Sequence, residues 1–213
     1  MVGGGYAGYR LLFPEIYVAK CYQPTRAFVP RKNWTVVDLG ANMGFYTLQA
    51  AWADKTVRVI AVEPVPVYVE VLKNNATRNN LKNIQVIQAA IGGCSGQQIP
   101  ITIWYSDTGE PMVQVRIPED AKRIETIQVP VLTLAEVFEL GRIVSCDLLK
   151  VDVEGAEYET LEAAPEDIWN RISRIIMEVH EKEGREKEEL NRLLKHHGFE
   201  VCTKGELLWG IKK

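Results

Sequence analysis

Residues 36–46 of the chain read V-V-D-L-G-A-N-M-G-F-Y, and this stretch decides the fold. A run of apolar, β-forming residues ends at Leu39, and two glycines, Gly40 and Gly44, follow within a short turn. Glycine permits the tight bend that a larger side chain would block. Because a helical pattern begins at Phe45, the stretch predicts a strand, a tight turn and then a helix.

The same alternation of strand and helix continues through most of the chain. Short apolar runs rich in β-branched residues are separated by helical patterns, which indicates parallel strands covered on both faces. Gly205 separates two further short runs, which predict a terminal hairpin. The fold class is therefore α/β: a doubly wound, mostly parallel, Rossmann-like sheet with a terminal antiparallel hairpin. The expected strands are 34–39, 57–62, 84–90, 148–153, 175–179, 200–203 and 207–211, and the expected helices are 45–53, 66–80, 158–164 and 185–197.

Residues 96–134 interrupt this alternation. Three β-like runs, 99–105, 112–117 and 126–134, follow one another without a long helical pattern between them. They predict a β insertion on the α/β scaffold, and we interpret it as a lid over the bound acceptor. A chain of 213 residues is long enough for one full-sized core. We therefore expect an N-terminal segment, residues 1–33, followed by a single domain, residues 34–213.

The composition narrows the choice of partners. A net charge of −3 provides no field that would hold a polyanion, which disfavours nucleic acid as the main partner. No stretch approaches the roughly 18 uninterrupted apolar residues that indicate a membrane-spanning helix. The four cysteines, Cys21, Cys94, Cys146 and Cys202, lie far apart without metal-type spacing. We expect them to be reduced, which favours a cytoplasmic location.

Acidic residues stand at the ends of three predicted strands: Asp38, Glu63 and Asp152. In an open parallel sheet, ligands bind beyond the carboxyl ends of the strands. Glu63 follows Asp38 by 25 residues, which suits a carboxylate that accepts hydrogen bonds from a ribose diol. A nucleoside-bearing ligand is therefore expected at this edge of the sheet.

The turn itself distinguishes between nucleoside cofactors. A dinucleotide turn needs G-x-G-x-x-G, whereas here Asn42 occupies the second glycine position and Gly44 follows at a different spacing. S-adenosylmethionine fits better because it carries adenosine and no phosphate. Its ammonium group would meet Asp38, and its carboxylate would meet the N–H groups of the turn. An NAD-dependent oxidoreductase and a non-catalytic, cofactor-binding regulatory domain remain the alternatives.

Several stretches together resemble the FkbM-type family of S-adenosylmethionine-dependent methyltransferases. The resemblance implies a class I methyltransferase sheet of seven strands with the last one antiparallel. It also implies methylation of a hydroxyl oxygen on a small-molecule acceptor, a sugar or metabolite. The matching stretches run in the family's order from residue 34 to 181: V-V-D-L-G-A-N-M-G-F-Y-T, A-V-E-P, K-N-N-A-T-R-N-N, Q-A-A-I-G, L-L-K-V-D-V-E-G-A-E and I-M-E-V-H.

The resemblance also implies, position by position, which residues bind the cofactor. Two places depart from the family's pattern: Gln88 stands where Asn or Asp is common, and T-L-A-E (133–136) replaces a segment with an earlier acid. The implied cofactor residues are Asp38, Gly40, Ala41, Asn42, Gly44 and Tyr46 in and around the turn, Glu63 and Pro64 after the second strand, and Gln88 and Ala89 after the third.

Methylation of a hydroxyl oxygen needs alignment and a group that removes the hydroxyl proton. Asp152 and Glu154 end the fourth predicted strand, and Glu178 and His180 end the fifth, beside the cofactor in this fold. We predict Asp152, Glu154 and His180 as catalytic residues, with Asp152 or His180 as the base. Asp152, Glu178 and His180 could also gather a divalent metal, but we expect none because two strands would have to supply all three ligands.

Overall fold

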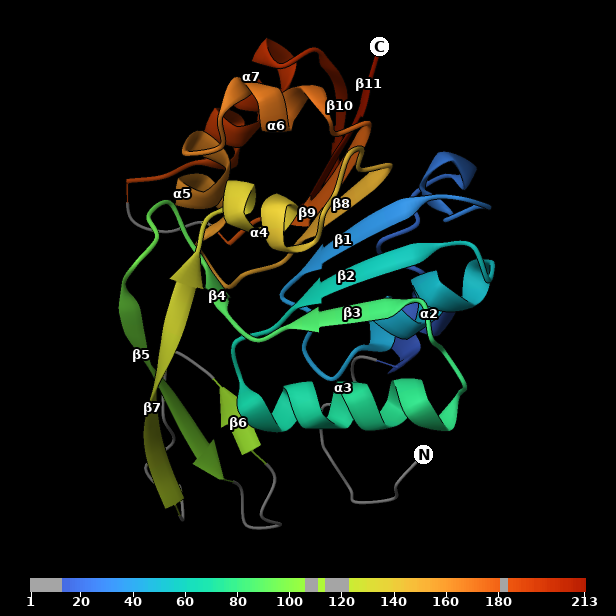
Figure 1. The fold of residues 1–213 in the computed structure, drawn as a ribbon. Coiled ribbons are helices and arrows are strands. Elements are labelled where there is room, and N and C mark those ends of the chain that lie inside the picture. The colour runs from blue at the N-terminus through green and yellow to red at the C-terminus, as the bar shows by residue number, and fades with distance from the viewer. Residues whose placement is uncertain (1–12, 106–110, 114–122, 181–183) are drawn as a thin grey trace.

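Figure 1 shows the computed structural model of the protein, in which residues 13–105, 111–113, 123–180 and 184–213 are described. Its central feature is a seven-stranded sheet in the order β10-β11-β9-β8-β1-β2-β3. Strands β3, β2, β1, β8 and β9 run parallel, whereas β11 is antiparallel to β9 and β10. The predicted Rossmann-like sheet with a terminal antiparallel hairpin is confirmed. The strands are β1 (Thr35–Leu39), β2 (Arg58–Val62), β3 (Ile84–Ile87), β8 (Leu148–Val151), β9 (Arg174–Glu178), β10 (Phe199–Lys204) and β11 (Leu207–Lys212).

Helices cover both faces of this sheet (Figure 1). Successive side chains of a strand point to opposite faces, so Val37 and Leu39 of β1 enter one core and Val36 enters the other. The first core is shared with α4 (Leu134–Leu140), α5 (Glu157–Glu162), α6 (Glu166–Asn170) and α7 (Lys187–His196). The second is shared with α2 (Phe45–Ala53), α3 (Pro66–Arg78) and the short helices η1 (Pro14–Ala19) and η2 (Arg26–Phe28).

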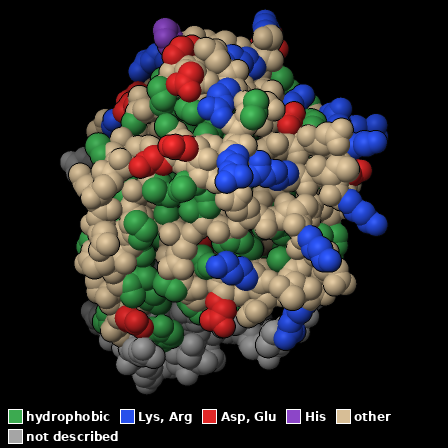
Figure 2. Space-filling model, in the orientation of Figure 1, with side chains coloured by type: hydrophobic (Ala, Val, Ile, Leu, Met, Phe, Trp, Pro, Cys, Tyr) green, Lys and Arg blue, Asp and Glu red, His purple; other side chains and the backbone are tan. Residues whose placement is uncertain are grey.

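A second, four-stranded sheet has the order β4-β7-β5-β6. Figure 1 shows it beyond the carboxyl ends of β1, β2 and β3. Figure 2 shows hydrophobic side chains exposed over this region, and Ile99 and Ile124 of its long strands are among the exposed ones. The predicted β insertion is thus present, although residues 114–117 of one predicted strand lie outside the described residues. The strands are β4 (Ala90–Ile91), β5 (Gln98–Tyr105), β6 (Pro111–Val113) and β7 (Arg123–Leu132).

Three predicted strands run too far at their C-terminal ends. The expected strand 148–153 ends at Val151, as β8. The expected strand 84–90 is divided: β3 ends at Ile87, where its partner β2 ends at Val62, and Ala90-Ile91 pairs with β7 instead. The expected strand 126–134 runs too far. β7 stops at Leu132 because the Thr133 side chain caps α4, a helix that the sequence interpretation missed, as it missed α6.

The N-terminal segment packs against the sheet domain. Ile16, Tyr22 and Phe28 are buried in the core that α2 covers. Among the helices that the structure describes, none has the length and apolar character needed to cross a bilayer. All four cysteines are free; Cys146 is buried, whereas Cys94 and Cys202 are exposed.

Candidate active site

The turn after β1 passes close against the chain that follows β8. Gly40 has a φ of +73°, and a Cβ atom there would lie 1.7 Å from the backbone oxygen of Asp152. Gly44 precedes α2 with a φ of +88°, and a Cβ atom there would lie 2.6 Å from Cγ of Leu72. Asn42, between the two glycines, has a φ of +51°. Both glycines are therefore required by close approaches as well as by the bend itself.

Glu63 joins the ends of β1 and β2. Its Oε2 accepts a hydrogen bond from the backbone N–H of Asn42 at 2.7 Å, and its Oε1 accepts one from that of Val65 at 3.0 Å. Burial raises the pKa of Glu63 to about 7, although both hydrogen bonds act in the opposite direction. Each carboxylate oxygen has a second acceptor position, so Glu63 can still receive hydrogen bonds from a ligand.

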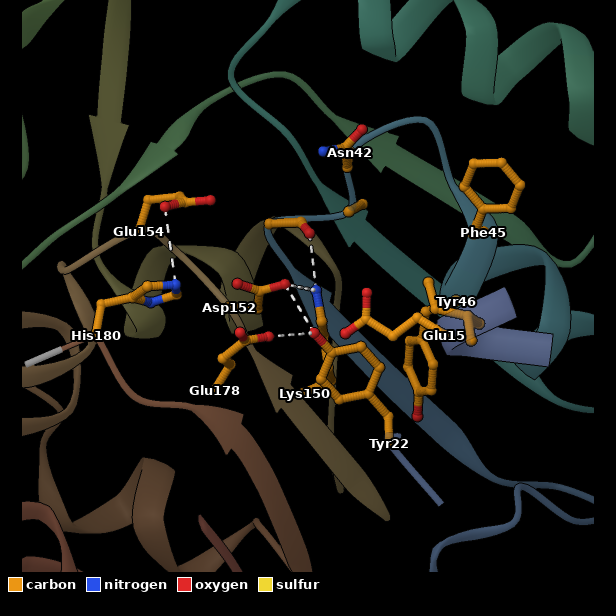
Figure 3. A pocket seen from close by; sticks show the side chains of 13 residues that line it. Glu15, Tyr22, Asn42, Phe45, Tyr46, Lys150, Asp152, Glu154, Glu178 and His180 are labelled. Carbon is orange, nitrogen blue, oxygen red and sulfur yellow. Dashed lines mark hydrogen bonds and ion pairs between the residues drawn. The ribbon is translucent and has the colours of Figure 1, made fainter. Parts of the chain in front are cut away.

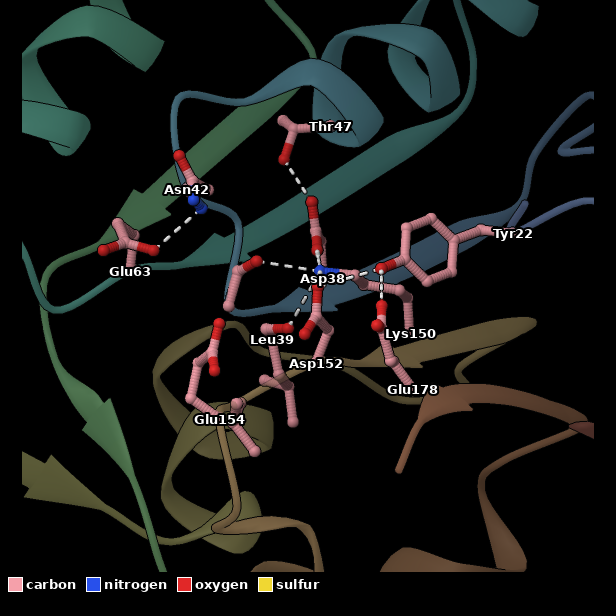
Figure 4. A network of polar contacts seen from close by, with 12 residues as sticks. Tyr22, Asp38, Leu39, Asn42, Thr47, Glu63, Lys150, Asp152, Glu154 and Glu178 are labelled. Atoms are coloured by element: carbon pink, nitrogen blue, oxygen red, sulfur yellow. Dashed lines mark hydrogen bonds and ion pairs between the residues drawn. The ribbon is translucent and has the colours of Figure 1, made fainter. Parts of the chain in front are cut away.

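Lys150, in β8, connects the turn to the candidate catalytic carboxylate, Asp152 (Figure 4). Its Nζ lies 3.1 Å from Asp38 Oδ1 and 3.4 Å from Asp152 Oδ2, and it donates a hydrogen bond of 2.8 Å to the Gly40 carbonyl. Thr47 donates to the second oxygen of Asp38 at 2.5 Å. Burial would lower the pKa of Lys150, but Asp38 and Asp152 raise it above its ordinary value. The lysine therefore stays charged and holds the two acidic side chains.

His180 lies between two glutamates that flank the start of α5. Its Nδ1 is 2.8 Å from Oε1 of the fully buried Glu157, and its Nε2 is 3.7 Å from Oε2 of the exposed Glu154. The hydrogen bond with Glu157 raises the pKa of His180 to about 9, although partial burial acts in the opposite direction. The imidazole therefore keeps its proton at neutral pH, when it is a hydrogen-bond donor rather than a base.

Tyr22 reaches the same site from the N-terminal segment. Its hydroxyl lies 2.9 Å from Asp152 Oδ2 and 3.2 Å from Glu178 Oε2 (Figure 4). The side chains that end β8 and β9 are thus in contact through a residue more than a hundred positions away in the chain.

Two cavities meet over the turn and share four residues, Gly40, Asn42, Asp152 and Glu154. The cavity next to β2, of about 330 Å³, is mostly apolar and contains Glu63. The other, of about 190 Å³ and shown in Figure 3, is lined by four acidic side chains, Glu15, Asp152, Glu154 and Glu178, together with Lys150 and His180. The shared residues make the two cavities neighbouring parts of one site.

Most of the predicted site residues line these cavities, and three do not. Asp38 lies beneath the turn, where Lys150 and Thr47 occupy its carboxylate. Gly44 packs against Leu72, and Gln88 is exposed outside the cavity walls. The lining residues among those predicted are Gly40, Ala41, Asn42, Tyr46, Glu63, Pro64, Ala89, Asp152, Glu154 and His180.

The sequence interpretation missed three residues of the site. Lys150 is a charged residue inside an apolar strand, two positions before Asp152, and this placement was a usable signal. Glu157 belongs to the quoted stretch E-G-A-E but was assigned no role. Tyr22 lies outside every quoted motif, so nothing in the pattern pointed to it.

Asp152, Glu154 and His180 form a cluster that could hold a metal ion. Each offers one ligand atom, and these atoms lie within 4.8 Å of one another. However, the Lys150 ammonium already pairs with Asp152, and the protonated His180 already lies beside Glu154. The expectation of no metal site therefore stays a prediction.

We expect Mn²⁺ to bind the complex with S-adenosylhomocysteine only weakly and without dependence on Glu154, because the site carries its own positive charges. Titration calorimetry with Mn²⁺ would measure this for the unmodified protein and for Glu154→Gln. Tight binding at one ion per chain that Glu154→Gln abolishes would contradict the prediction.

The order of the sheet, with its glycine turn after β1 and an acid after β2, defines a class I methyltransferase fold. Solved structures with this fold are similar at low sequence identity. An rRNA methylase from Streptococcus thermophilus matches with a TM-score of 0.52 and 14% identity, over 87% of this chain and 90% of that one. A putative caffeoyl-CoA O-methyltransferase from Staphylococcus aureus matches with a TM-score of 0.51 and 12% identity, over 84% and 76%.

Residues 38–201 match the family described as the methyltransferase FkbM domain, and the chain belongs to this family. A relative, the 31-O-demethyl-FK506 methyltransferase FkbM of Streptomyces tacrolimicus, is 27% identical over 227 residues, which cover 94% of this chain and 85% of the relative. Methyltransferase sdnD of Sordaria araneosa is 28% identical over 229 residues, with the same coverage. The protein is therefore an S-adenosylmethionine-dependent methyltransferase of the FkbM type, rather than an oxidoreductase or a non-catalytic domain.

Proposed function

We propose that the protein methylates a hydroxyl oxygen of a small molecule, a sugar or metabolite, with Asp152 as the base. The observation that carries this proposal is the junction of the two cavities at Asp152. A cofactor that occupies the apolar cavity beside Glu63 and crosses the turn ends next to this carboxylate. The relative from Streptomyces tacrolimicus supports oxygen as the acceptor atom, since its name states that it acts on 31-O-demethyl-FK506.

The larger cavity supports the placement of the adenosine. Val62, Val65 and Ile91 give it apolar walls, and its volume of about 330 Å³ falls within the range of small-molecule pockets, roughly 300–1,000 Å³. Glu63, with two acceptor positions left, would hold the ribose hydroxyls. The expected contact between the turn N–H groups and the carboxylate of the cofactor has no such support, because these groups already donate within the protein. Those of Gly40 and Ala41 donate to the Val62 carbonyl, and that of Asn42 donates to Glu63.

The charges of the smaller cavity support Asp152 as the base. Bound S-adenosylmethionine supplies an electrophilic methyl group on a positively charged sulfur. Tyr22 and Lys150 both contact Oδ2 of Asp152, so Oδ1 is the oxygen that would take the hydroxyl proton. His180 holds its own proton at neutral pH and, with Glu154 beside it, would contribute charge rather than accept the proton.

The acceptor class is tested with methyl-labelled S-adenosylmethionine and a cell extract separated into small-molecule, protein and RNA fractions. We expect the label in the small-molecule fraction, in a product that resists the mild hydrolysis that cleaves methyl esters. Label in protein or RNA would contradict the proposed acceptor. The cofactor is tested separately: a protein that binds S-adenosylhomocysteine and does not bind NAD would still agree with it.

Glu63→Ala is expected to weaken S-adenosylhomocysteine binding by about 1.5–3 kcal/mol, because the ribose would lose charge-assisted hydrogen bonds. Glu63 has a pKa of about 7, so it is ionised at pH 8 and protonated at pH 6. A protonated oxygen donates instead of accepting, and affinity should therefore fall about tenfold from pH 8 to pH 6. Titration calorimetry across this range measures both effects. An equal pH dependence in Glu63→Ala would show that another group causes it.

A further inference from the structure

Tyr22 is buried and packed, although it comes from the N-terminal segment that precedes the stretch matched to the family. Only 4% of the residue is exposed, and its ring meets that of Tyr46 edge-on at 5.3 Å between centroids. The Lys150 ammonium lies 5.1 Å from the centre of the same ring. The family match begins at residue 38, so Tyr22 lies outside it. Its hydroxyl is thus placed by packing at a definite point of the smaller cavity.

That hydroxyl lies between two carboxylates, 2.9 Å from Asp152 and 3.2 Å from Glu178. A phenol has one proton to donate, so it can form a hydrogen bond to only one ionised carboxylate at a time. The second short contact between oxygens is favourable when that carboxyl group itself carries a proton and donates to the phenol oxygen. The geometry therefore accommodates one extra proton in the group of three side chains.

The surrounding charges decide which carboxyl group holds this proton. Asp152 is already paired with the Lys150 ammonium, at 3.4 Å. Burial and the negative charges of Asp152 and Glu15 raise the pKa of Glu178. Tyr22 and His180 lower it, and the net effect is an increase. Glu178 is thus the member of the group that binds a proton more readily.

We propose that Tyr22 is a positioning residue for the reaction, which donates its proton to Asp152 and accepts one from Glu178. This inference rests on the proposed function, since it assumes that Asp152 is the base. A donor fixed on Oδ2 leaves Oδ1 as the oxygen that receives the acceptor's proton. The N-terminal segment therefore completes the active site of the methyltransferase domain.

The first test compares Tyr22→Phe with Tyr17→Phe, a matched control five positions earlier. The Tyr17 hydroxyl also makes a hydrogen bond, of 3.0 Å, but to the Phe45 carbonyl, and Tyr17 itself lines neither cavity. Turnover is measured with methyl-labelled S-adenosylmethionine and the extract fraction that accepts the label. We expect Tyr22→Phe to lower turnover about 10- to 100-fold, the effect of losing a hydrogen bond to a charged group. Tyr17→Phe should stay within about twofold of the unmodified protein, by the same comparison of rates.

Two further readouts separate positioning from a structural role. Tyr22→Phe should move the acidic limb of the pH–rate profile upward by about one unit, because the carboxylate loses a donor that favours its ionised form. Its affinity for S-adenosylhomocysteine should stay unchanged. Equal pH profiles for the two phenylalanine variants would overturn the proposal.

The second test asks whether Glu178 acts as a donor. Glu178→Gln keeps a neutral donor for the Tyr22 oxygen, so its turnover should stay within a few-fold, whereas Glu178→Ala should resemble Tyr22→Phe. Infrared difference spectra of the S-adenosylhomocysteine complex at mildly acidic pH should show a protonated carboxyl band that Glu178→Gln removes. Equal loss of turnover in both variants, or no such band, would overturn the proposal.

These outcomes are distinct from a failure of the proposed function. If the unmodified protein binds S-adenosylhomocysteine and methylates a small molecule, yet Tyr22→Phe behaves like Tyr17→Phe, this inference alone is wrong. If no methylated hydroxyl group (a methyl ether) forms with any extract fraction, the proposed function is wrong, and so is the role of Tyr22 that rests on it.

Discussion

Replacing Asp152 with asparagine is expected to lower turnover by about 10²–10⁴-fold while leaving S-adenosylhomocysteine affinity nearly unchanged. Asparagine keeps the shape of the side chain and can still accept the hydrogen bond from Tyr22, but it cannot take a proton. Cofactor binding depends on the turn and on Glu63, at the ends of β1 and β2, so it should persist. Single-turnover transfer of labelled methyl groups, with calorimetry for the affinity, measures the two effects separately.

Two comparisons make this result specific. Asp147→Asn changes an aspartate at the opposite end of the same strand, where it accepts a 2.8 Å hydrogen bond from the Thr35 N–H. It should leave turnover within about twofold. His180→Gln should lower turnover only about tenfold, because the imidazole supplies charge rather than removing a proton. A large loss with His180→Gln and a small one with Asp152→Asn would make His180 the base instead.

The parts of the fold that the sequence predicted are those set by local pattern. The helix expected at 45–53 is α2, with the same bounds, because Gly44 and the change to helical spacing at Phe45 mark its start. The hairpin of β10 and β11 was likewise visible as two short apolar runs about Gly205. In these places the tertiary structure agrees with what each segment prefers by itself.

The predictions failed where a boundary depends on a partner elsewhere in the chain. β3 stops at Ile87 because β2 has already ended, and Ala90-Ile91 pairs with β7, more than forty residues away. α4 is a different case, since Thr133 and Glu136 form a capping box that was visible in T-L-A-E. That segment was interpreted as a departure from the family, and the helix start that it predicts was overlooked.

In the candidate site, too, local pattern predicted some residues, whereas others depend on how distant parts of the chain pack. The residues at strand ends, such as Glu63 and Asp152, were found because the carboxyl ends of parallel strands meet at one edge. Which of them face a cavity was not predictable, and Asp38 proved to lie beneath the turn, paired with Lys150. Tyr22 could not be found at all, because its position depends on how an unpatterned segment packs on the finished domain.

Gly40→Ala tests how strictly the turn depends on the close approach to β8. The left-handed backbone by itself costs about 1–2 kcal/mol for a residue with a Cβ atom. Here the new atom would also lie 1.7 Å from the Asp152 carbonyl oxygen, so the backbone of one strand end must move. We therefore expect unfolding in urea to show a loss of about 3 kcal/mol or more. Affinity for S-adenosylhomocysteine should fall at least about 100-fold, because the turn and Asp152 are displaced together.

Gly96→Ala provides the matched control, because it separates backbone strain from collision. Gly96 has a φ of +76°, close to the +73° of Gly40, yet a Cβ atom there would meet no described atom within 4 Å. Its replacement should cost only the strain, about 1–2 kcal/mol, and leave cofactor affinity unchanged. If the two variants lost equal stability, the contact between the turn and the end of β8 would be looser than the structure indicates. The junction of the two cavities, on which the assignment of Asp152 depends, would then have to be drawn differently.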